Sequence, residues 1–224
     1  AQLLPRRAEF GGIVTNLARE MELAQVRVRR GVEVTLDLVA AERPDAVVLA
    51  TGALPFVPDV PSDGEVQIVT AWQVLRREVK VGRRVVVADW RSDWIGSGLA
   101  EAVARDGSQV TLAVTGLHAG EVLPLYVRDN IAAELHRLRV EVRPYLRLFG
   151  TAGRSVFLQH TPSGEAVEVE EVDSVVLCLG HRPVEHLSEG IAAMGIEVAM
   201  AGDCLAPRTA EEAVYDGLRA GVGL

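Results

Sequence analysis

The stretch RVVVADWRSDWIGSGLAEAVARDGSQVTLAV, residues 84–114, decides the fold class of this 224-residue chain. Residues 84–89 and 109–114 are short runs rich in apolar, β-branched side chains, which is typical of strands buried in a parallel sheet. Between them, residues 94–105 place apolar side chains on one helical face. These are Ile95, Leu99, Ala102 and Val103. A strand, a helix and a strand in about 30 residues predict a βαβ unit and an α/β fold.

Further elements extend this unit toward the C-terminus. The sequence Thr-Pro-Ser-Gly at residues 161–164 lies between two alternating runs, which predicts a hairpin. A largely apolar run before Gly180 predicts one more buried strand. The expected elements are a helix at 126–138 and strands at 140–142, 155–160, 166–170 and 174–179.

The segments on either side predict a second, incomplete set of elements. Residues 1–24 carry apolar side chains at three- and four-residue steps, which predicts a helix with one buried stripe. Residues 26–29 alternate like a half-buried strand, and residues 46–50 suit a strand covered on both faces. The set is completed by a Pro- and Gly-rich loop over 51–64, a strand over 197–201 and a helix over 210–220. We therefore expect two Rossmann-like units with central parallel sheets, the first incomplete and interrupted by the second.

The composition excludes several classes of function. The chain has 23 basic and 31 acidic residues, a net charge of −8, which argues against a nucleic-acid binder because phosphate contacts need clustered Lys and Arg. No apolar run reaches the roughly 18 residues of a transmembrane helix, so we expect no membrane partner. The spacing of His and Cys predicts no metal site. Cys178 and Cys204 stand alone, which fits a reducing cytoplasm.

Two glycine-containing motifs follow predicted strands and carry the functional hypothesis. In Ala50-Thr51-Gly52-Ala53, the glycine lets the backbone turn tightly and approach a ligand at the carboxyl end of the strand. In Ala201-Gly202-Asp203-Cys204, a carboxylate follows another strand end, where it can accept hydrogen bonds from sugar-like hydroxyls. Thr209 and Glu212 then have capping-box spacing at a helix N-terminus, which offers free N–H groups to an anionic ligand. The structural alternative is a tight turn and a capped helix beside a solvated Asp203.

Together these motifs resemble two-dinucleotide-binding-domain flavoproteins, in particular the trimethylamine dehydrogenase and 2,4-dienoyl-CoA reductase (NADH:flavin oxidoreductase) family. The resemblance is strongest at Gly202-Asp203-Cys204-Leu205-Ala206-Pro207-Arg208 and at Glu212-Ala213-Val214-Tyr215-Asp216-Gly217-Leu218-Arg219-Ala220-Gly221. Arg7-Ala8-Glu9-Phe10, which leads into the first helix, resembles the segment after the first nucleotide-binding βαβ unit of that family. The likeness spans nearly the whole chain.

The resemblance implies a role for each unit. Residues 1–80 with 197–224 would form a partial FAD/ADP-type dinucleotide-binding domain, and residues 81–196 an inserted NAD(P)-type domain. The region would hold FAD as an electron relay or ADP as a structural ligand, within a flavin-dependent oxidoreductase of the amine dehydrogenase or enoyl reductase type. No catalytic residue of the substrate reaction is expected in it. The implied cofactor-binding residues are Thr51, Gly52, Ala53, Gly202, Asp203, Glu212 and Ala213.

The resemblance also implies parts that this sequence does not contain. Members of the family carry an N-terminal TIM barrel with FMN, a four-cysteine iron–sulfur segment and a first G-x-G-x-x-G unit. Two cysteines cannot hold a four-iron cluster, and no G-x-G-x-x-G precedes Ala50. We therefore expect a C-terminal fragment, or one subunit of a split enzyme, that is inactive alone and has the barrel region as its partner. Homo-oligomerisation stays open.

The opening of the inserted unit departs from the dinucleotide fingerprint. Of the glycines expected between its first strand and helix, only the last is matched, by Gly96. Asp89 and Asp93 would repel a pyrophosphate, and Val114-Thr115-Gly116 offers no acid for a ribose and no Arg for a 2′-phosphate. These features disfavour NAD(P)H binding and a stand-alone NAD(P)-dependent reductase. The alternative from another class is a non-catalytic scaffold that docks a barrel or a partner subunit and binds no nucleotide.

Overall fold

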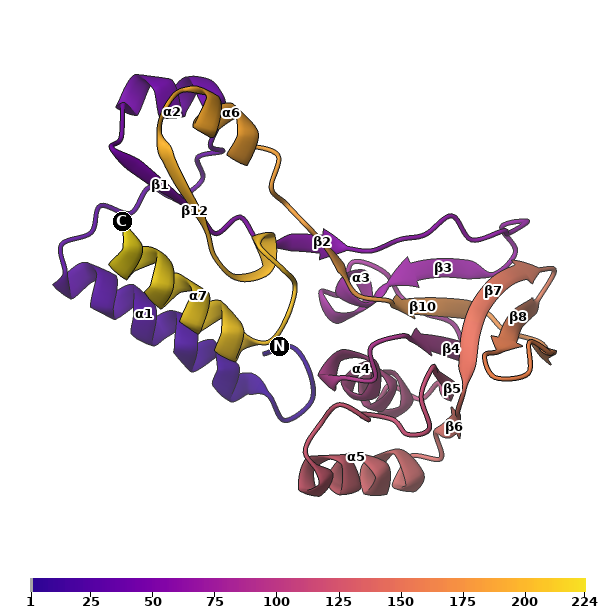
Figure 1. Cartoon of the computed structure of the whole chain (residues 1–224). Helices are drawn as coiled ribbons and strands as arrows, with labels where there is room; N and C mark the ends of the chain where they lie inside the picture. Colours follow the sequence, from indigo (N-terminus) through magenta and orange to yellow (C-terminus); the bar gives the residue numbers. More distant parts are fainter. Residues whose placement is uncertain (1) are drawn as a thin grey trace. The chain divides into compact units, whose positions relative to one another are not determined.

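The computed structural model describes residues 2–224 and divides the chain into two compact units (Figure 1). Unit 1 comprises the described residues up to Leu23 together with Val57–Leu179, and unit 2 comprises Ala24–Phe56 and Gly180–Leu224. Unit 2 is interrupted in the sequence by unit 1, and the predicted α/β fold with two units is confirmed. The dinucleotide types assigned to residues 1–80 with 197–224 and to 81–196 stay predictions.

Unit 1 is built on a five-stranded parallel sheet with the strand order β3-β10-β4-β5-β6. Val85, Val86 and Val87 of β4 are all buried, although successive side chains of a strand point to opposite faces, so both faces of the sheet are covered. This is why its strands read as nearly continuous apolar runs. The strands are β3 Gln67–Thr70, β4 Arg84–Asp89, β5 Gln109–Val114, β6 Glu141–Arg143 and β10 Ser174–Cys178.

Helices cover one face of this sheet, and the antiparallel sheet β7-β8-β9 covers the other (Figure 1). Both α4 and β7 contact β4 and β5. Leu99 of α4 and Leu135 of α5 are fully buried in the core that α4 and α5 share with Val87 and Leu112. The covering elements are α3 Ala71–Leu75, α4 Trp94–Arg105, α5 Leu125–Arg137, β7 Leu146–Ala152, β8 Ser155–His160 and β9 Ala166–Val169.

The N-terminal helix of unit 1 leaves its apolar stripe exposed. The short helix η1 Ala8–Phe10 leads into α1 Gly11–Leu23, so the predicted helix is confirmed. No residue of α1 is buried, and Val14 is 69% exposed, so the predicted buried stripe is wrong. The helical spacing of apolar side chains therefore predicts the helix correctly, but it does not show whether another element covers the apolar face.

Unit 2 is built on two pairs of strands. β1 Ala46–Leu49 pairs in parallel with β12 Glu197–Met200, and β2 Ala53–Pro55 pairs in antiparallel fashion with β11 His181–Pro183. Val48 of β1 is 43% exposed, so the predicted cover on both faces of this strand is wrong. Residues 26–29 form no strand and the side chains of Val26 and Val28 are exposed, which corrects that prediction too.

Two short helices and a longer C-terminal one complete unit 2. α2 Leu36–Glu42 and α6 Ser188–Ala193 pack closely, because a Cβ built on Gly190 would lie 2.6 Å from Leu36 Cδ1. η2 Gly202–Cys204 precedes α7 Ala210–Gly223, which confirms the predicted C-terminal helix. The core consists of Val39, Leu49, Leu187, Ile191 and Cys204. Over residues 2–224, no helix combines the length and the apolarity needed to cross a membrane.

Candidate functional site

The two predicted glycine motifs meet at one edge of unit 2. β1 and β12 run parallel with Leu49 opposite Met200, so both strands end at the same edge. The N–H of Ala201 donates to the carbonyl of Leu49 at 2.9 Å, and Cys204 Sγ contacts the same carbonyl at 2.9 Å. Because these bonds tie the two strand ends together, the loop after β1 and the loop after β12 form one composite site.

Glycine is required at the turn in both loops. Gly52 has φ +75° and Gly202 has φ +68°, a region that residues with a Cβ rarely adopt. A Cβ built on Gly52 would meet nothing within 4 Å, so space lies open beside this turn. A Cβ built on Gly202 would lie 3.4 Å from Ala213 Cβ, which shows that α7 packs closely on this loop.

Thr51 and Ala53 support the first loop from within the chain. The hydroxyl of Thr51 donates to the carbonyl of Val184, and the N–H of Val184 donates to the carbonyl of Gly52 at 3.0 Å. Ala53 is buried and pairs with Pro183 in the β2–β11 ladder. The role of Thr51 and Ala53 as cofactor ligands stays a prediction, and the structure gives both residues a part in holding the turn.

Asp203 lies beside an ion pair that the sequence analysis did not identify. Its Oδ1 accepts the N–H of Arg208 at 3.4 Å. The Arg208 guanidinium pairs instead with Asp216 at 2.5 Å, and Asp216 also accepts the N–H of Gly202 at 3.3 Å. Asp216 is only 8% exposed. The sequence signal that could have revealed this pair is the position of Asp216, which lies on the same helix face as Ala213 and Ala220.

Glu212 is engaged in capping α7. Its carboxylate accepts the N–H of Thr209 at 3.0 Å and also contacts the Thr209 hydroxyl. The hydrogen bond from the Thr209 side chain lowers the pKa of the Glu212 carboxyl below its usual value. The predicted capping box is therefore present, and cofactor binding by Glu212 and Ala213 stays a prediction.

The equivalent edge of unit 1 is occupied by Asp89, the last residue of β4. Asp89 is fully buried, and its Oδ1 accepts the N–H groups of Arg91 at 3.0 Å and of Ser92 at 2.9 Å. Its Oδ2 has no hydrogen-bond partner within residues 2–224. Burial raises the pKa of Asp89 to about 7, and Asp93 adds to this effect.

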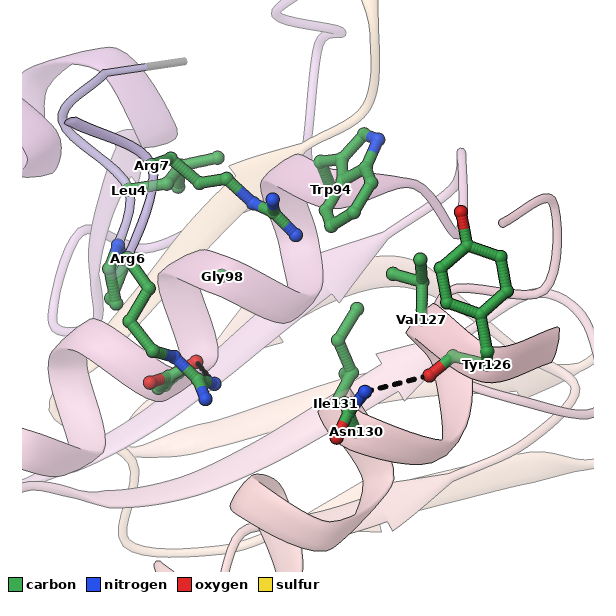
Figure 2. A pocket seen from close by; sticks show the side chains of 11 residues that line it. Leu4, Arg6, Arg7, Trp94, Gly98, Tyr126, Val127, Asn130 and Ile131 are labelled. Carbon is green, nitrogen blue, oxygen red and sulfur yellow. Dashed lines mark hydrogen bonds and ion pairs between the residues drawn. The ribbon is translucent and has the colours of Figure 1, made fainter. Parts of the chain in front are cut away.

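A pocket of about 430 Å³ lies in unit 1 between the N-terminal segment and the helices α4 and α5 (Figure 2). Leu4 is buried against Gly98 of α4, where an added Cβ would lie 3.0 Å from Leu4 Cδ2. Arg6 pairs with Glu101 at 3.0 Å, and the Arg7 guanidinium lies 3.7 Å from the centre of the Trp94 ring. Both arginines are engaged within the chain, so we interpret this pocket as the seam that anchors the N-terminal segment.

Neither cysteine is paired. Cys178 ends β10 and Cys204 ends η2, and both are buried free thiols. Burial, together with the nearby Asp89 and Asp93, raises the pKa of Cys178 well above its usual value, which keeps this thiol protonated. In the part of the chain that the structure describes, no group of three His, Cys, Asp or Glu side chains could hold a metal ion.

The family model for pyridine nucleotide-disulphide oxidoreductases matches residues 14–215. The chain belongs to this family. The match includes both units and both glycine motifs, and it agrees with the predicted resemblance to two-dinucleotide-binding-domain flavoproteins. FAD/NAD(P)-type dinucleotide binding is the property that the family implies.

Curated relatives are longer than this chain. The chain is similar to the N,N-dimethylglycine/sarcosine dehydrogenase of Chromohalobacter salexigens, with 27% identity over 256 residues that cover 96% of this chain and 37% of that protein. It is also similar to the bilirubin reductase of Mediterraneibacter gnavus, with 26% identity over 91% of this chain and 31% of that protein. The chain thus spans about a third of the length of these relatives.

Solved structures share the fold over the whole chain. The histamine dehydrogenase of Rhizobium sp. 4-9 has a TM-score of 0.84 at 22% identity, covering 100% of this chain and 37% of that one. The 6-hydroxypseudooxynicotine amine oxidase of Pseudomonas geniculata N1 has a TM-score of 0.87 at 22% identity, covering 98% of this chain and 35% of that one.

Proposed function

We propose that this chain is the dinucleotide-holding region of a flavin-dependent oxidoreductase, with the edge of unit 2 at β1 and β12 as its cofactor site. The observation that carries the proposal is the meeting of Gly52, Gly202 and Asp203 at one sheet edge. Ligands of open α/β sheets bind outside the carboxyl ends of the strands, where such loops lie.

The residues of this edge fit FAD or ADP. The open space beside Gly52 allows close approach of a ligand to the backbone. Asp203 is half-buried, and the neighbouring guanidinium of Arg208 pairs with Asp216 and not with Asp203. The Asp203 carboxylate can therefore accept a hydrogen bond from a hydroxyl group of a ligand. We assign Asp203 to a ribose or ribityl hydroxyl. Bound FAD would supply electron transfer, whereas ADP would have a structural role.

The rest of the site would come from a region that the longer relatives possess. Each relative extends well beyond the third of its length that matches this chain. We propose that such a region, a barrel in the same protein or in a partner subunit, supplies the substrate site and the remaining cofactor contacts. FMN and an iron–sulfur cluster would belong to that region.

Replacing Asp203 by Ala in the natural full-length protein tests the cofactor site. A hydrogen bond to a charged acceptor contributes about 1.5–3 kcal/mol, so the retained nucleotide should bind roughly tenfold to a hundredfold more weakly. Nucleotide released by heat is identified by chromatography, and the melting temperature is measured on the same preparation. Glu211→Ala is the matched control, because Glu211 is an exposed acid in the first turn of α7.

The outcomes separate a cofactor site from electrostatic support of a helix. Loss of nucleotide in Asp203→Ala with retention in Glu211→Ala supports the proposal. Unchanged nucleotide content with a lower melting temperature would assign Asp203 to electrostatic support of the start of α7 alone. A full-length protein that is colourless and releases no adenine nucleotide would favour the scaffold alternative.

A further inference from the structure

We infer that unit 1 has lost the nicotinamide site of its family, because its own chain fills the crevice where a dinucleotide would bind. In a doubly wound sheet this crevice lies outside the carboxyl ends of β4 and β5, at the start of α4. Three connected features close it in this protein, and each involves the turn that the carboxyl of Asp89 holds. The inference concerns unit 1 alone and does not depend on which cofactor unit 2 holds.

The first feature is that carboxylates take the amides that a pyrophosphate needs. Asp89 accepts the N–H groups of Arg91 and Ser92, and Asp93 accepts the N–H of Ile95 at 2.8 Å. The amides of Arg91 and Ser92 lie in the turn between β4 and α4, and that of Ile95 lies in the first turn of α4. In dinucleotide-binding units this region faces the phosphates. A pyrophosphate would have to displace both carboxyl groups from these amides and would meet the charge of Asp93.

The second feature is steric. With Gly96 as the third glycine of the fingerprint, Arg91 and Asp93 stand at its first and second glycine positions. The second glycine normally lets the backbone approach the phosphates, and here Asp93 presents a side chain instead. Gly96 keeps its packing role, but the group packed against it is the carboxyl of Asp89, which lies 2.3 Å from where a Cβ would stand.

The third feature is that the loop after β5 lies across the same turn. Val122 N–H donates to the carbonyl of Ser92 at 3.3 Å, and the Thr115 hydroxyl donates to the carbonyl of Trp90 at 3.2 Å. A dinucleotide normally passes between these two loops. Here direct hydrogen bonds join them, so the path of the ligand is occupied by the chain.

Glu121, an acid that could serve a ribose, is also engaged within its own loop. Glu121 lies beyond the end of β5, and its Oε2 accepts the N–H of Leu117 at 2.9 Å. The same oxygen stands 1.6 Å from where a Cβ on Gly116 would lie. Glu121 therefore covers the strand end, and a ribose would have to break this contact before reaching the carboxylate.

The consequence concerns electron flow. An oxidoreductase built on this chain does not exchange electrons with NADH or NADPH at this crevice of unit 1. Asp89 occupies the amides that would bind the phosphates of a nicotinamide nucleotide, and the loop 115–124 blocks the path that the nucleotide would follow. Unit 1 shares the fold of its family, but its residues do not fit the pyridine nucleotide after which the family is named.

Titration of the isotope-labelled chain with NADH tests this inference. Amide chemical shifts of Arg91, Ser92 and Leu117 should stay unchanged up to about 1 mM NADH, a concentration that would half-saturate even a site of about −4 kcal/mol. The amides of Gly202 and Arg208 report on unit 2. Binding of NADH to unit 2 is therefore distinguished from binding to unit 1. Saturable shifts at Arg91 and Ser92 in the wild type would overturn the inference.

Two variants identify the closing group. Asp89→Gly removes the carboxyl and should bring NADH binding at Arg91 and Ser92 to a dissociation constant of about 1 mM or below, at least tenfold tighter than wild type. Asp89→Asn is the matched control, because its amide oxygen occupies the same place and accepts the same N–H groups, so it should bind no NADH. An Asp89→Gly variant that folds and still binds nothing would show that Asp89 does not close the site.

A measurement on the wild type decides the question if Asp89→Gly does not fold. The N–H groups of Arg91 and Ser92 should exchange slowly with solvent, because Asp89 holds them in a buried turn. NADH at about 1 mM should leave these exchange rates unchanged. A rate that falls further as NADH is added would mean that the nucleotide reaches the turn, and the inference would be wrong.

Discussion

Asp89 and Gly96 are in direct contact across the turn between β4 and α4: a Cβ on Gly96 would lie 2.3 Å from both Cγ and Oδ2 of Asp89. The carboxyl of Asp89 therefore fills the space that a side chain at position 96 would occupy. Because Asp89 is fully buried, it cannot swing aside into solvent. The pair links the packing of α4 to the closure of the crevice in unit 1.

This contact predicts a non-additive pair of substitutions. Gly96→Ala should lower the free energy of unfolding by about 1–3 kcal/mol, because overpacking a closed site forces neighbouring groups to move. In an Asp89→Ala background the same substitution should cost much less, since the clashing group is gone. Urea unfolding of the four proteins gives the coupling energy. Additive effects would contradict the contact.

The buried carboxyl of Asp89 predicts how stability depends on pH. Burial raises the pKa of Asp89 from 3.8 to about 7 in the folded chain, so the folded state keeps the proton where the unfolded state releases it. Between about pH 4 and pH 7 the unfolded chain binds fewer protons, and the free energy of unfolding falls by up to about 1.4 kcal/mol per pH unit. Above about pH 7 this loss is complete.

Asp89→Asn is the variant that isolates this effect. The amide is neutral at every pH, so its free energy of unfolding should stay flatter than that of wild type between about pH 4 and pH 7. Asp93, Arg91 and Cys178, which face Asp89, are present in both proteins, so their contributions largely cancel. Parallel curves for the two proteins over this range would show that Asp89 is ionised in the folded state.

The N-terminal segment offers a matched pair of adjacent leucines. Leu4 is 6% exposed against Gly98, whereas Leu3 is 54% exposed. Leu4→Ala should cost about 2 kcal/mol or more by loss of buried apolar area, and it should release the segment to proteolysis. Leu3→Ala should change little. Mass spectrometry of the first cleavage products reads this out, and equal cleavage of both variants would show that Leu4 does not anchor the segment.

The central βαβ unit was predictable because its signals are local. The helix over 94–105 and the strands over 84–89 and 109–114 have the predicted bounds. Strands buried on both faces read as apolar runs, and α4 repeats its apolar side chains at helical spacing. The capping carboxylate of Asp93, which accepts the N–H of Ile95, fixes where α4 begins.

Short elements and surface strands could not be predicted in the same way. β7 was missed because its register shifts between Leu148 and Gly150 and Phe149 is 67% exposed, so the strand lacks a continuous apolar face. α2 and α6 have seven and six residues, too few for a helical period to show. Their formation depends on packing against each other, through Gly190 and Leu36, which is a tertiary contact.

The loops that carry Gly52 and Gly202 could be located from the sequence, whereas the charges beside them could not. Parallel strands end at one edge, so the meeting of Gly52 and Gly202 followed from strand order. The Arg208–Asp216 pair depends on how the loop before α7 folds back on the helix, which no local pattern specifies. The sequence predicts Asp89 as a charge that repels a pyrophosphate, and the structure shows a buried group that accepts hydrogen bonds from its own turn.

The Arg208–Asp216 pair predicts that the loop that carries Gly202 and Asp203 depends on a charge two turns into α7. Arg208→Ala leaves the nearly buried Asp216 without its cation, and we expect a loss of about 1–2 kcal/mol, reduced because Arg208 itself is partly exposed. Arg219→Ala, which removes an exposed arginine from the same helix, is the control and should cost less than about 0.5 kcal/mol. In the double variant Arg208→Ala/Asp216→Asn, the buried charge is gone, so part of the stability should return. Chemical unfolding of all four proteins gives these differences. If Arg208→Ala and Arg219→Ala cost the same, the ion pair contributes nothing, and the loop that carries Gly202 and Asp203 is held by its other contacts, such as those to Leu49 and Ala213.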